Sequence, residues 1–271
     1  AATAAQGRVS GLLDAAVSRG LTSADKAAAQ LASMRFQAGY DGLQDAGLAI
    51  EAAFEDMAVK KAVLNALDSA MPDAVLATNT SYLDIDDMAG WLADPSRLVG
   101  LHFFSPAHIM KLLEIVRGKV SSDAALATGF ALAKRLGKLP VMVGVCDGFV
   151  GNRMLQRVRE AAEHLLLDGA EFTQIDRVMT NFGYAMGLYM TQDLSGLDIA
   201  WANRKRQADT RDPDRRYSRV QDDMCAAGRF GRKSGAGWYI YEDGAKPVPN
   251  PAVAALVEDE ADRHGIIRQP M

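Results

Sequence analysis

The chain has 271 residues, of which 49% are hydrophobic and 24% charged, so it carries enough apolar material for one or two compact domains. This composition excludes a disordered, a collagen-like and a coiled-coil chain. The formal net charge of −4 offers no basic surface to nucleic acid or to an anionic membrane, and neither is expected as a partner.

The first part of the chain predicts two helices followed by alternating strands and helices. Residues 2–33 carry apolar side chains at helical spacing, and Thr22 with Asp25 resembles the capping box of the second helix. From residue 34 to 145, short apolar runs alternate with amphipathic stretches, which indicates an α/β layer with a largely parallel sheet. The predicted strands are 48–52, 75–77, 98–102, 112–116 and 141–145, and the predicted helices among them are 57–71, 84–91 and 123–136.

The rest of the chain predicts helices only. After Gly144 the strand pattern stops, and helical periodicity follows at 149–168, 172–183 and 251–264. We therefore expect an α/β domain followed by an all-α domain, with the boundary at 145–148. Within the first domain one alternative stays open, because the run 112–116 can also turn back and pair antiparallel with 98–102.

The cysteines and the apolar runs exclude further classes of protein. Cys146 and Cys225 stand far apart without a Cys/His cluster, so we predict no disulfide framework and no metal site. No apolar run approaches the roughly 18 residues that a membrane-spanning helix needs. A soluble protein from a reducing compartment is expected, without a membrane partner.

Glu114 and His102 are the strongest candidates for chemistry. Glu114 lies within an apolar run, where an ionised carboxylate is unfavourable unless it is paired. His102 ends the preceding predicted strand and is within reach if the two strands are neighbours. A carboxylate beside an imidazole fixes its tautomer and raises its basicity, which predicts a general base. The alternative is a structural role, in which Glu114 pairs with Lys111 or Arg117.

Polar side chains also follow two other predicted elements. Thr80 and Ser81 come after the strand 75–77, at the edge where parallel sheets bind ligands. Their hydroxyls either contact a ligand or cap the next helix. Asn152 stands at the domain boundary and either presents its amide to a substrate or bonds local backbone. No Gly-x-Gly-x-x-Gly, P-loop, His-Glu-x-x-His or Gly-x-Ser-x-Gly motif occurs in the chain.

Taken in chain order, these motifs resemble the 3-hydroxyacyl-CoA dehydrogenase family, and most of all the dehydrogenase part of peroxisomal-type multifunctional β-oxidation enzymes. The resemblance extends from about residue 45 to residue 241. The segments that carry it are 50–56 with Val59-Lys60, 79–81, His-Phe-Phe-Ser-Pro at 102–106, 110–114, Gly-Phe-Val-Gly-Asn-Arg at 148–153, Met186-Gly187 and 228–235.

The resemblance implies a fold, a reaction and a set of roles. It implies a partial Rossmann-like NAD-binding domain at 1–145, a helical domain at 146–271, and NAD-dependent oxidation of L-3-hydroxyacyl-CoA in fatty acid β-oxidation. Acyl-CoA would be the substrate and NAD the cofactor. The implied catalytic residues are His102 as base, Glu114 as its orienting partner, Ser81 at the substrate oxygen and Asn152 as a substrate-orienting amide. The implied cofactor-binding residues are Ala52, Glu55, Lys60, Ser81 and Ser105, although many family members carry Asn at the last of these positions.

Relative to the family, the chain lacks the Gly-rich βαβ start that holds the dinucleotide pyrophosphate. From this we expect a fragment of a larger enzyme with impaired dinucleotide binding. The alternative function is a CoA-ester-binding or dimerising module without turnover, and a dehydrogenase of free 3-hydroxy acids is a further alternative. We also expect a homodimer through the helical domain, and a cytoplasmic or, in a eukaryote, a peroxisomal location.

Overall fold

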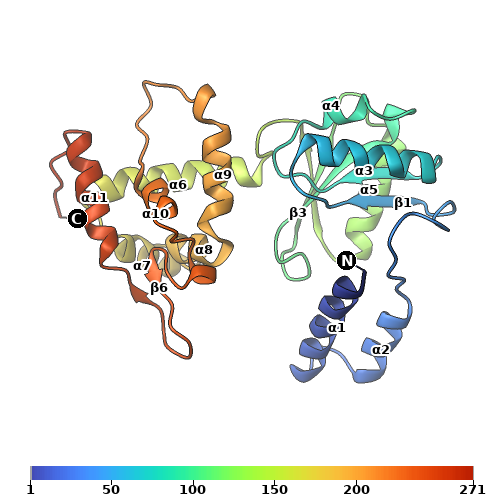
Figure 1. Ribbon diagram of the computed structural model, residues 1–271, viewed down its shortest axis with the longest axis horizontal. Helices are drawn as coiled ribbons and strands as arrows, with labels where there is room; N and C mark the ends of the chain where they lie inside the picture. Colours follow the sequence, from blue (N-terminus) through green and yellow to red (C-terminus); the bar gives the residue numbers. More distant parts are fainter. Residues whose placement is uncertain (1, 271) are drawn as a thin grey trace. The chain divides into compact units, whose positions relative to one another are not determined.

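The computed structural model describes residues 2–270 and divides into two compact units at Asn152 (Figure 1). We call the part up to Asn152 the sheet unit and the part from Arg153 onward the helical unit. Within residues 2–270, no helix is long and apolar enough to cross a membrane.

A five-stranded mixed sheet forms the centre of the sheet unit, with the strand order β1-β2-β3-β4-β5. The strands are β1 (Leu48–Glu51), β2 (Val75–Thr78), β3 (Leu98–Phe103), β4 (Leu112–Arg117) and β5 (Leu139–Gly144). The first three run parallel, β4 is antiparallel to β3, and β5 is again parallel to β4. The antiparallel alternative for residues 112–116 is therefore confirmed. The physical reason is that the short connection from β3 to β4 cannot carry the crossover that a parallel pair needs.

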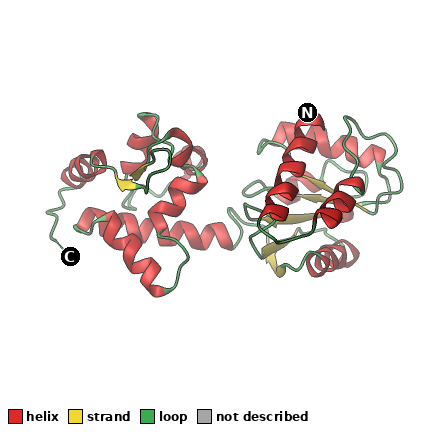
Figure 2. Ribbon diagram, turned by 90° about the horizontal axis from the view of Figure 1, so that it is seen from below, coloured by secondary structure: helices red, strands yellow, loops and turns green. Residues whose placement is uncertain are grey.

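Helices cover both faces of this sheet, as Figure 2 shows. They are α3 (Met57–Ala70), α4 (Ile85–Ala89) and α5 (Asp123–Arg135). Leu64 of α3 and Met88 of α4 share one buried core with Leu98 of β3. Leu126 of α5 packs in a second core with Leu101, three residues further along β3. Because neighbouring residues of a strand point to opposite faces, the buried apolar runs of this sheet supply both cores.

Two helices precede the sheet, α1 (Ala2–Ser18) and α2 (Ala24–Ala32). They confirm the two helices predicted from the alanine-rich start. The predicted cap of the second helix is wrong, because the residue with extended backbone at its N-terminus is Ser23 and not Thr22. The Ser23 side chain accepts a hydrogen bond from the Lys26 amide at 3.3 Å.

The helical unit is built around a buried aromatic core. Its helices are α6 (Gly151–Asp168), α7 (Phe172–Phe182), α8 (Leu188–Ser195), α9 (Leu197–Arg206), α10 (Val220–Ala226) and α11 (Ala252–Arg263). Phe172, Tyr189 and Trp238 meet in this core, with ring centroids 4.3–6.1 Å apart. The prediction of an all-α domain needs one correction, since Tyr239–Ile240 (β6) pairs antiparallel with Val248–Pro249 (β7). Two-residue strands are too short to leave an alternating pattern in the sequence.

Buried carboxylates connect these elements. Asp193 is fully buried and accepts hydrogen bonds from the amides of Trp238 and Tyr239 and from the hydroxyl of Tyr241, at 2.9–3.1 Å. Burial raises the pKa of the Asp193 carboxyl to about 6, although these three hydrogen bonds favour the ionised form. Asp193 therefore binds its proton more tightly in the folded chain than in the unfolded chain.

This shift predicts how stability changes with pH. A raised carboxyl pKa stabilises the fold at pH values below the unfolded pKa, and the contribution is lost as the pH rises through about 6. The difference in unfolding free energy between the wild type and Asp193→Asn should therefore shrink from about pH 4 to about pH 7. Urea unfolding at both pH values measures it, with the exposed Asp243→Asn as the control. A difference that grows with pH would contradict this prediction.

Candidate active site

His102 and Glu114 face each other across the antiparallel pair of strands. The register pairs His102 of β3 directly with Glu114 of β4, and Nδ1 of the histidine lies 2.6 Å from Oε2 of the glutamate. Both residues are buried, with 4% and 1% of their surfaces exposed. Because an ionised carboxylate only accepts, the Nδ1–H donates to it, and the lone pair of the neutral imidazole is on Nε2. We call this pair the dyad.

The second carboxylate oxygen of Glu114 is held by backbone. Its Oε1 accepts hydrogen bonds from the amides of Val150 and Gly151, at 3.0 and 2.8 Å. Burial favours the neutral acid, but the hydrogen bonds from His102, Gly151 and Val150 outweigh it, so the pKa of the Glu114 carboxyl lies below its usual value. Neither of the two alternative partners, Lys111 and Arg117, forms an ion pair with Glu114 within the described residues, and Arg117 instead contacts Asp123 at 3.5 Å.

Ser81 lies in a loop that Glu55 holds in place. Oε1 of Glu55 accepts hydrogen bonds from Thr80 Oγ1 and from the amides of Ser81 and Tyr82, at 2.6, 2.7 and 3.1 Å. The Ser81 hydroxyl makes no hydrogen bond within residues 2–270. The predicted capping role of Thr80 or Ser81 is wrong, because Asp84 caps α4.

Asn79 connects this loop to the strand that carries His102. Its Oδ1 accepts a hydrogen bond from the Phe103 amide at 2.8 Å, and the Asn79 amide donates to the Glu51 carbonyl at the same distance. The loops after β1 and β2 are thus tied to the end of β3. The sequence placed Asn79 in a segment that carries the family resemblance but gave it no role, and its position directly after a parallel strand was the available signal.

Lys60 is buried beneath these loops, together with Glu51. Its ammonium lies 2.9 and 3.0 Å from the two carboxylate oxygens of Glu51 and 3.4 Å from Glu55. Thr78 donates a further hydrogen bond to Glu51 at 2.7 Å. Since Lys60 is 0% exposed, its charge acts on the site through Glu51 and Glu55 and not by direct contact with a ligand.

The other predicted site residues lie at the rim of this region. Ala52 is exposed after β1, and Ser105 is exposed in the connection after β3, where the Ser105–Pro106 peptide bond is cis. Asn152 is half-buried in the first turn of α6, and its side chain makes no hydrogen bond within the described residues. All these residues, with the dyad and Ser81, belong to the sheet unit.

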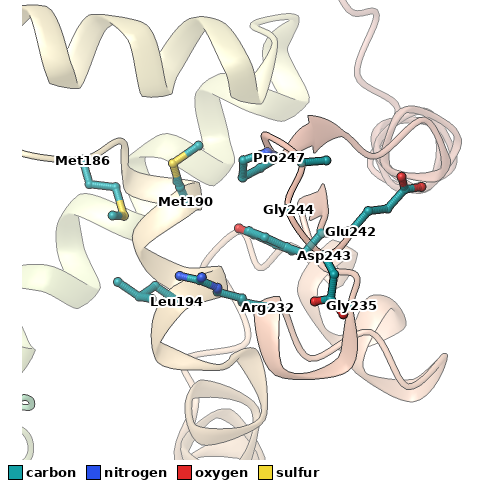
Figure 3. A pocket seen from close by; sticks show the side chains of 11 residues that line it. Met186, Met190, Leu194, Arg232, Gly235, Glu242, Asp243, Gly244 and Pro247 are labelled. Carbon is teal, nitrogen blue, oxygen red and sulfur yellow. The ribbon is translucent and has the colours of Figure 1, made fainter. Parts of the chain in front are cut away.

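The helical unit contains a surface cavity of about 640 Å³, shown in Figure 3. Met190 and Leu194 of α8 and Met186 before it line one side of the cavity. Arg232 and residues between 235 and 247 complete the lining. None of the predicted site residues lines this cavity. Among residues 2–270, no cluster of His, Cys, Asp or Glu side chains could hold a metal ion.

The fold and the dyad together define a class of protein, in which an α/β dinucleotide-binding domain precedes a helical domain. Comparison with family models identifies the particular family. Residues 1–146 match the 3-hydroxyacyl-CoA dehydrogenase NAD binding domain, and residues 148–241 match the C-terminal domain of the same family. The chain therefore belongs to the 3-hydroxyacyl-CoA dehydrogenase family, which confirms the resemblance seen in the sequence.

Individual relatives agree with this assignment. The peroxisomal bifunctional enzyme of Danio rerio is 44% identical over 252 residues, which cover 88% of this chain and 35% of the relative. The crystal structure of M. tuberculosis FadB2 has a TM-score of 0.82 and 34% identity, with 89% of this chain and 86% of that chain covered. (S)-3-hydroxybutyryl-CoA dehydrogenase PaaH1 from Ralstonia eutropha has a TM-score of 0.78 and 32% identity, with 86% and 84% covered. The chain spans about a third of the length of the curated relatives that it matches.

The residues at the ends of β1 and β2 fit the nicotinamide half of the NAD that this family implies. The free hydroxyl of Ser81 can donate to a ligand there, and Phe54, 78% exposed just after β1, offers an apolar face. A pyrophosphate is normally held by a glycine-rich turn, and the sequence contains no such motif.

Proposed function

We propose that the chain catalyses the NAD-dependent oxidation of L-3-hydroxyacyl-CoA to 3-oxoacyl-CoA, as the dehydrogenase part of a β-oxidation enzyme. The observation that carries this proposal is the dyad, in which the 2.6 Å hydrogen bond to Glu114 directs the proton to Nδ1 of His102. Nε2 is then the basic atom, and it makes no hydrogen bond within the described residues.

Each residue of the site has a role in this reaction. Nε2 of His102 accepts the proton of the 3-hydroxyl group, and the ionised Glu114 stabilises the imidazolium that forms. The Ser81 hydroxyl donates to the substrate's 3-oxygen, and the Asn152 amide orients the thioester side of the substrate. NAD, when bound beside the ends of β1 and β2, would supply the acceptor for the hydride of C3.

The proposed cofactor-binding residues act either by direct contact with the nicotinamide or through a neighbouring side chain. We assign direct contacts with the nicotinamide side to the exposed backbone at Ala52, to Glu55, to Ser81 and to Ser105. Lys60 contributes from below, because its ammonium lies 3.4 Å from Glu55 and attracts that carboxylate. The names of the relatives support a peroxisomal location in a eukaryote, and a cytoplasmic one is proposed for a bacterium.

A single assay separates this function from the alternative. Acetoacetyl-CoA and NADH are mixed with the chain, and absorbance at the nicotinamide band is followed. Loss of NADH that requires both substrates supports the dehydrogenase. Binding of acetoacetyl-CoA measured by calorimetry, without any loss of NADH, would instead identify a CoA-ester-binding module.

We further propose that the helical unit forms a homodimer. Support comes from exposed apolar side chains at helical spacing, Met154 and Val158 on α6 and Val178 and Phe182 on α7. Phe182 is 82% exposed and stacks on the exposed ring of Tyr184. An apolar surface of this kind is typically covered by association, and identical chains favour a two-fold pair.

The dimer has a direct test. Light scattering at micromolar concentration should report about twice the chain mass of 29.1 kDa. Phe182→Asp should shift the mass toward the monomer, whereas Ile267→Asp, at an exposed apolar residue outside α6 and α7, should not. A wild-type mass near 29.1 kDa at every concentration would rule out the dimer.

A further inference from the structure

The turn that joins β5 to α6 has an unusual backbone at a large buried residue. Phe149 has φ +46°, a left-handed conformation that non-glycine residues rarely adopt and that is unfavourable for a bulky side chain. It follows Gly148, which has φ +73°, and it is 0% exposed. A glycine would adopt this backbone without strain, whereas phenylalanine adopts it at a cost that the contacts of its buried side chain offset.

That side chain packs on the catalytic candidate. The Phe149 ring centroid lies 5.7 Å from the His102 imidazole centroid, at an interplanar angle of 55°. The Phe104 ring centroid lies 4.5 Å from the same imidazole centroid. Two aromatic rings therefore border the His102 imidazole, and its one hydrogen bond within residues 2–270 is the one to Glu114.

The backbone of the same turn holds the other member of the dyad. The amides of Val150 and Gly151, directly after Phe149, donate to Oε1 of Glu114 at 3.0 and 2.8 Å. Gly151 also lies close to Phe104, since an added Cβ would stand 2.5 Å from the Phe104 ring and 3.6 Å from Glu114 Oε1. One turn thus contacts the imidazole through a side chain and the carboxylate through its amides.

We propose that residues 148–151, the dyad turn, act as the positioning element of the active site and that Phe149 is its positioning residue. The left-handed backbone directs the Phe149 ring to His102 while the following amides face Glu114. Imidazole and carboxylate are thereby restrained from one rigid segment, and Nε2 keeps its direction toward the substrate. The expected change in kcat rests on the proposed dehydrogenase function. The position of the imidazole does not, because the dyad turn restrains it whether or not the protein turns over a substrate.

The test compares Phe149→Leu and Phe149→Met with Phe172→Leu, which removes a ring of similar burial from the core of the helical unit. If the dyad turn positions the base, the Phe149 variants should lower kcat about 10- to 100-fold and leave KM for acetoacetyl-CoA and NADH within about twofold. Phe172→Leu should lose comparable stability without a change in kcat. Equal effects of the three variants on stability, with kcat unchanged in all, would overturn the proposal.

A second measurement does not depend on turnover. In wild-type protein with ¹⁵N-labelled histidine, the His102 Nδ1 proton should give a downfield signal, assigned by its loss in His102→Asn, and cross-peaks should connect the His102 and Phe149 rings. In Phe149→Leu the Nδ1 signal should broaden through faster exchange. Absence of the ring–ring cross-peaks in the wild type overturns the proposal. If the cross-peaks are present but no NADH is consumed, the proposed dehydrogenase function fails while the positioning role stands.

Discussion

Replacing His102 with asparagine should lower kcat for acetoacetyl-CoA reduction by about 10²–10⁴-fold, because the variant has no acid–base group at the position of Nε2 to donate the proton that the 3-oxygen takes up in this direction. KM for both substrates should change little, since the proposed substrate contacts of Ser81 and Asn152 stay in place. Stopped assays at high enzyme concentration measure the residual rate. The matched control is His108→Asn, at an exposed histidine of the same unit, which should keep wild-type kcat.

The same substitution will also affect stability. His102 is only 4% exposed and packs against Phe104 and Phe149, and its loss leaves Oε2 of Glu114 without a donor. A loss of about 1–3 kcal/mol of unfolding free energy is expected from the unpaired carboxylate oxygen. Activity must therefore be compared well below the melting temperature of the variant. Near wild-type kcat in folded His102→Asn would show that the base is another residue.

Glu114→Gln should be the second most damaging change, with kcat reduced about 100-fold or more. An amide has one accepting oxygen, whereas Glu114 accepts on both oxygens, from His102 and from the amides of Val150 and Gly151. If the Gln oxygen faces His102, its NH₂ group points at two backbone donors. If it faces the backbone, the NH₂ group donates to Nδ1 and the imidazole carries its proton on Nε2, where the base is needed.

The stability of this variant relative to wild type gives an independent measure. The pKa of the Glu114 carboxyl is lowered in the folded chain, so its ionised form stabilises the fold above the unfolded pKa, and this contribution is lost as the pH falls through the folded pKa. The stability difference between wild type and Glu114→Gln should therefore be larger at about pH 7 than at about pH 3. The control is Asp123→Asn, at a carboxylate whose side chain is 94% exposed. If the loss of activity in Glu114→Gln is explained by its lower melting temperature alone, the dyad has a structural role.

Local sequence patterns predicted most of the elements in the sheet unit. Apolar runs marked all five strands. The three central strands β2, β3 and β4 are apolar because they are buried, whereas the edge strand β5 is apolar although Leu139, Val141 and Met142 are exposed. Glu114 could be predicted to have a partner since an isolated carboxylate in a strand is unfavourable, and the distance of 2.6 Å to His102 agrees with this reasoning. The helix caps were less certain, because Thr22 and Ser23 both have the chemistry of a cap and only the backbone conformation selects one.

What the sequence alone determined is therefore the alternation of elements, the pairing requirement of Glu114 and the family. Only the tertiary structure decided that β4 runs antiparallel to β3, which brings His102 opposite Glu114 in register. It also decided that Lys60 is buried against Glu51 and that the ring of Phe149 lies on the imidazole. These contacts join residues distant in the chain, and their geometry depends on strand register and on one left-handed backbone, neither of which leaves a periodic pattern in the sequence.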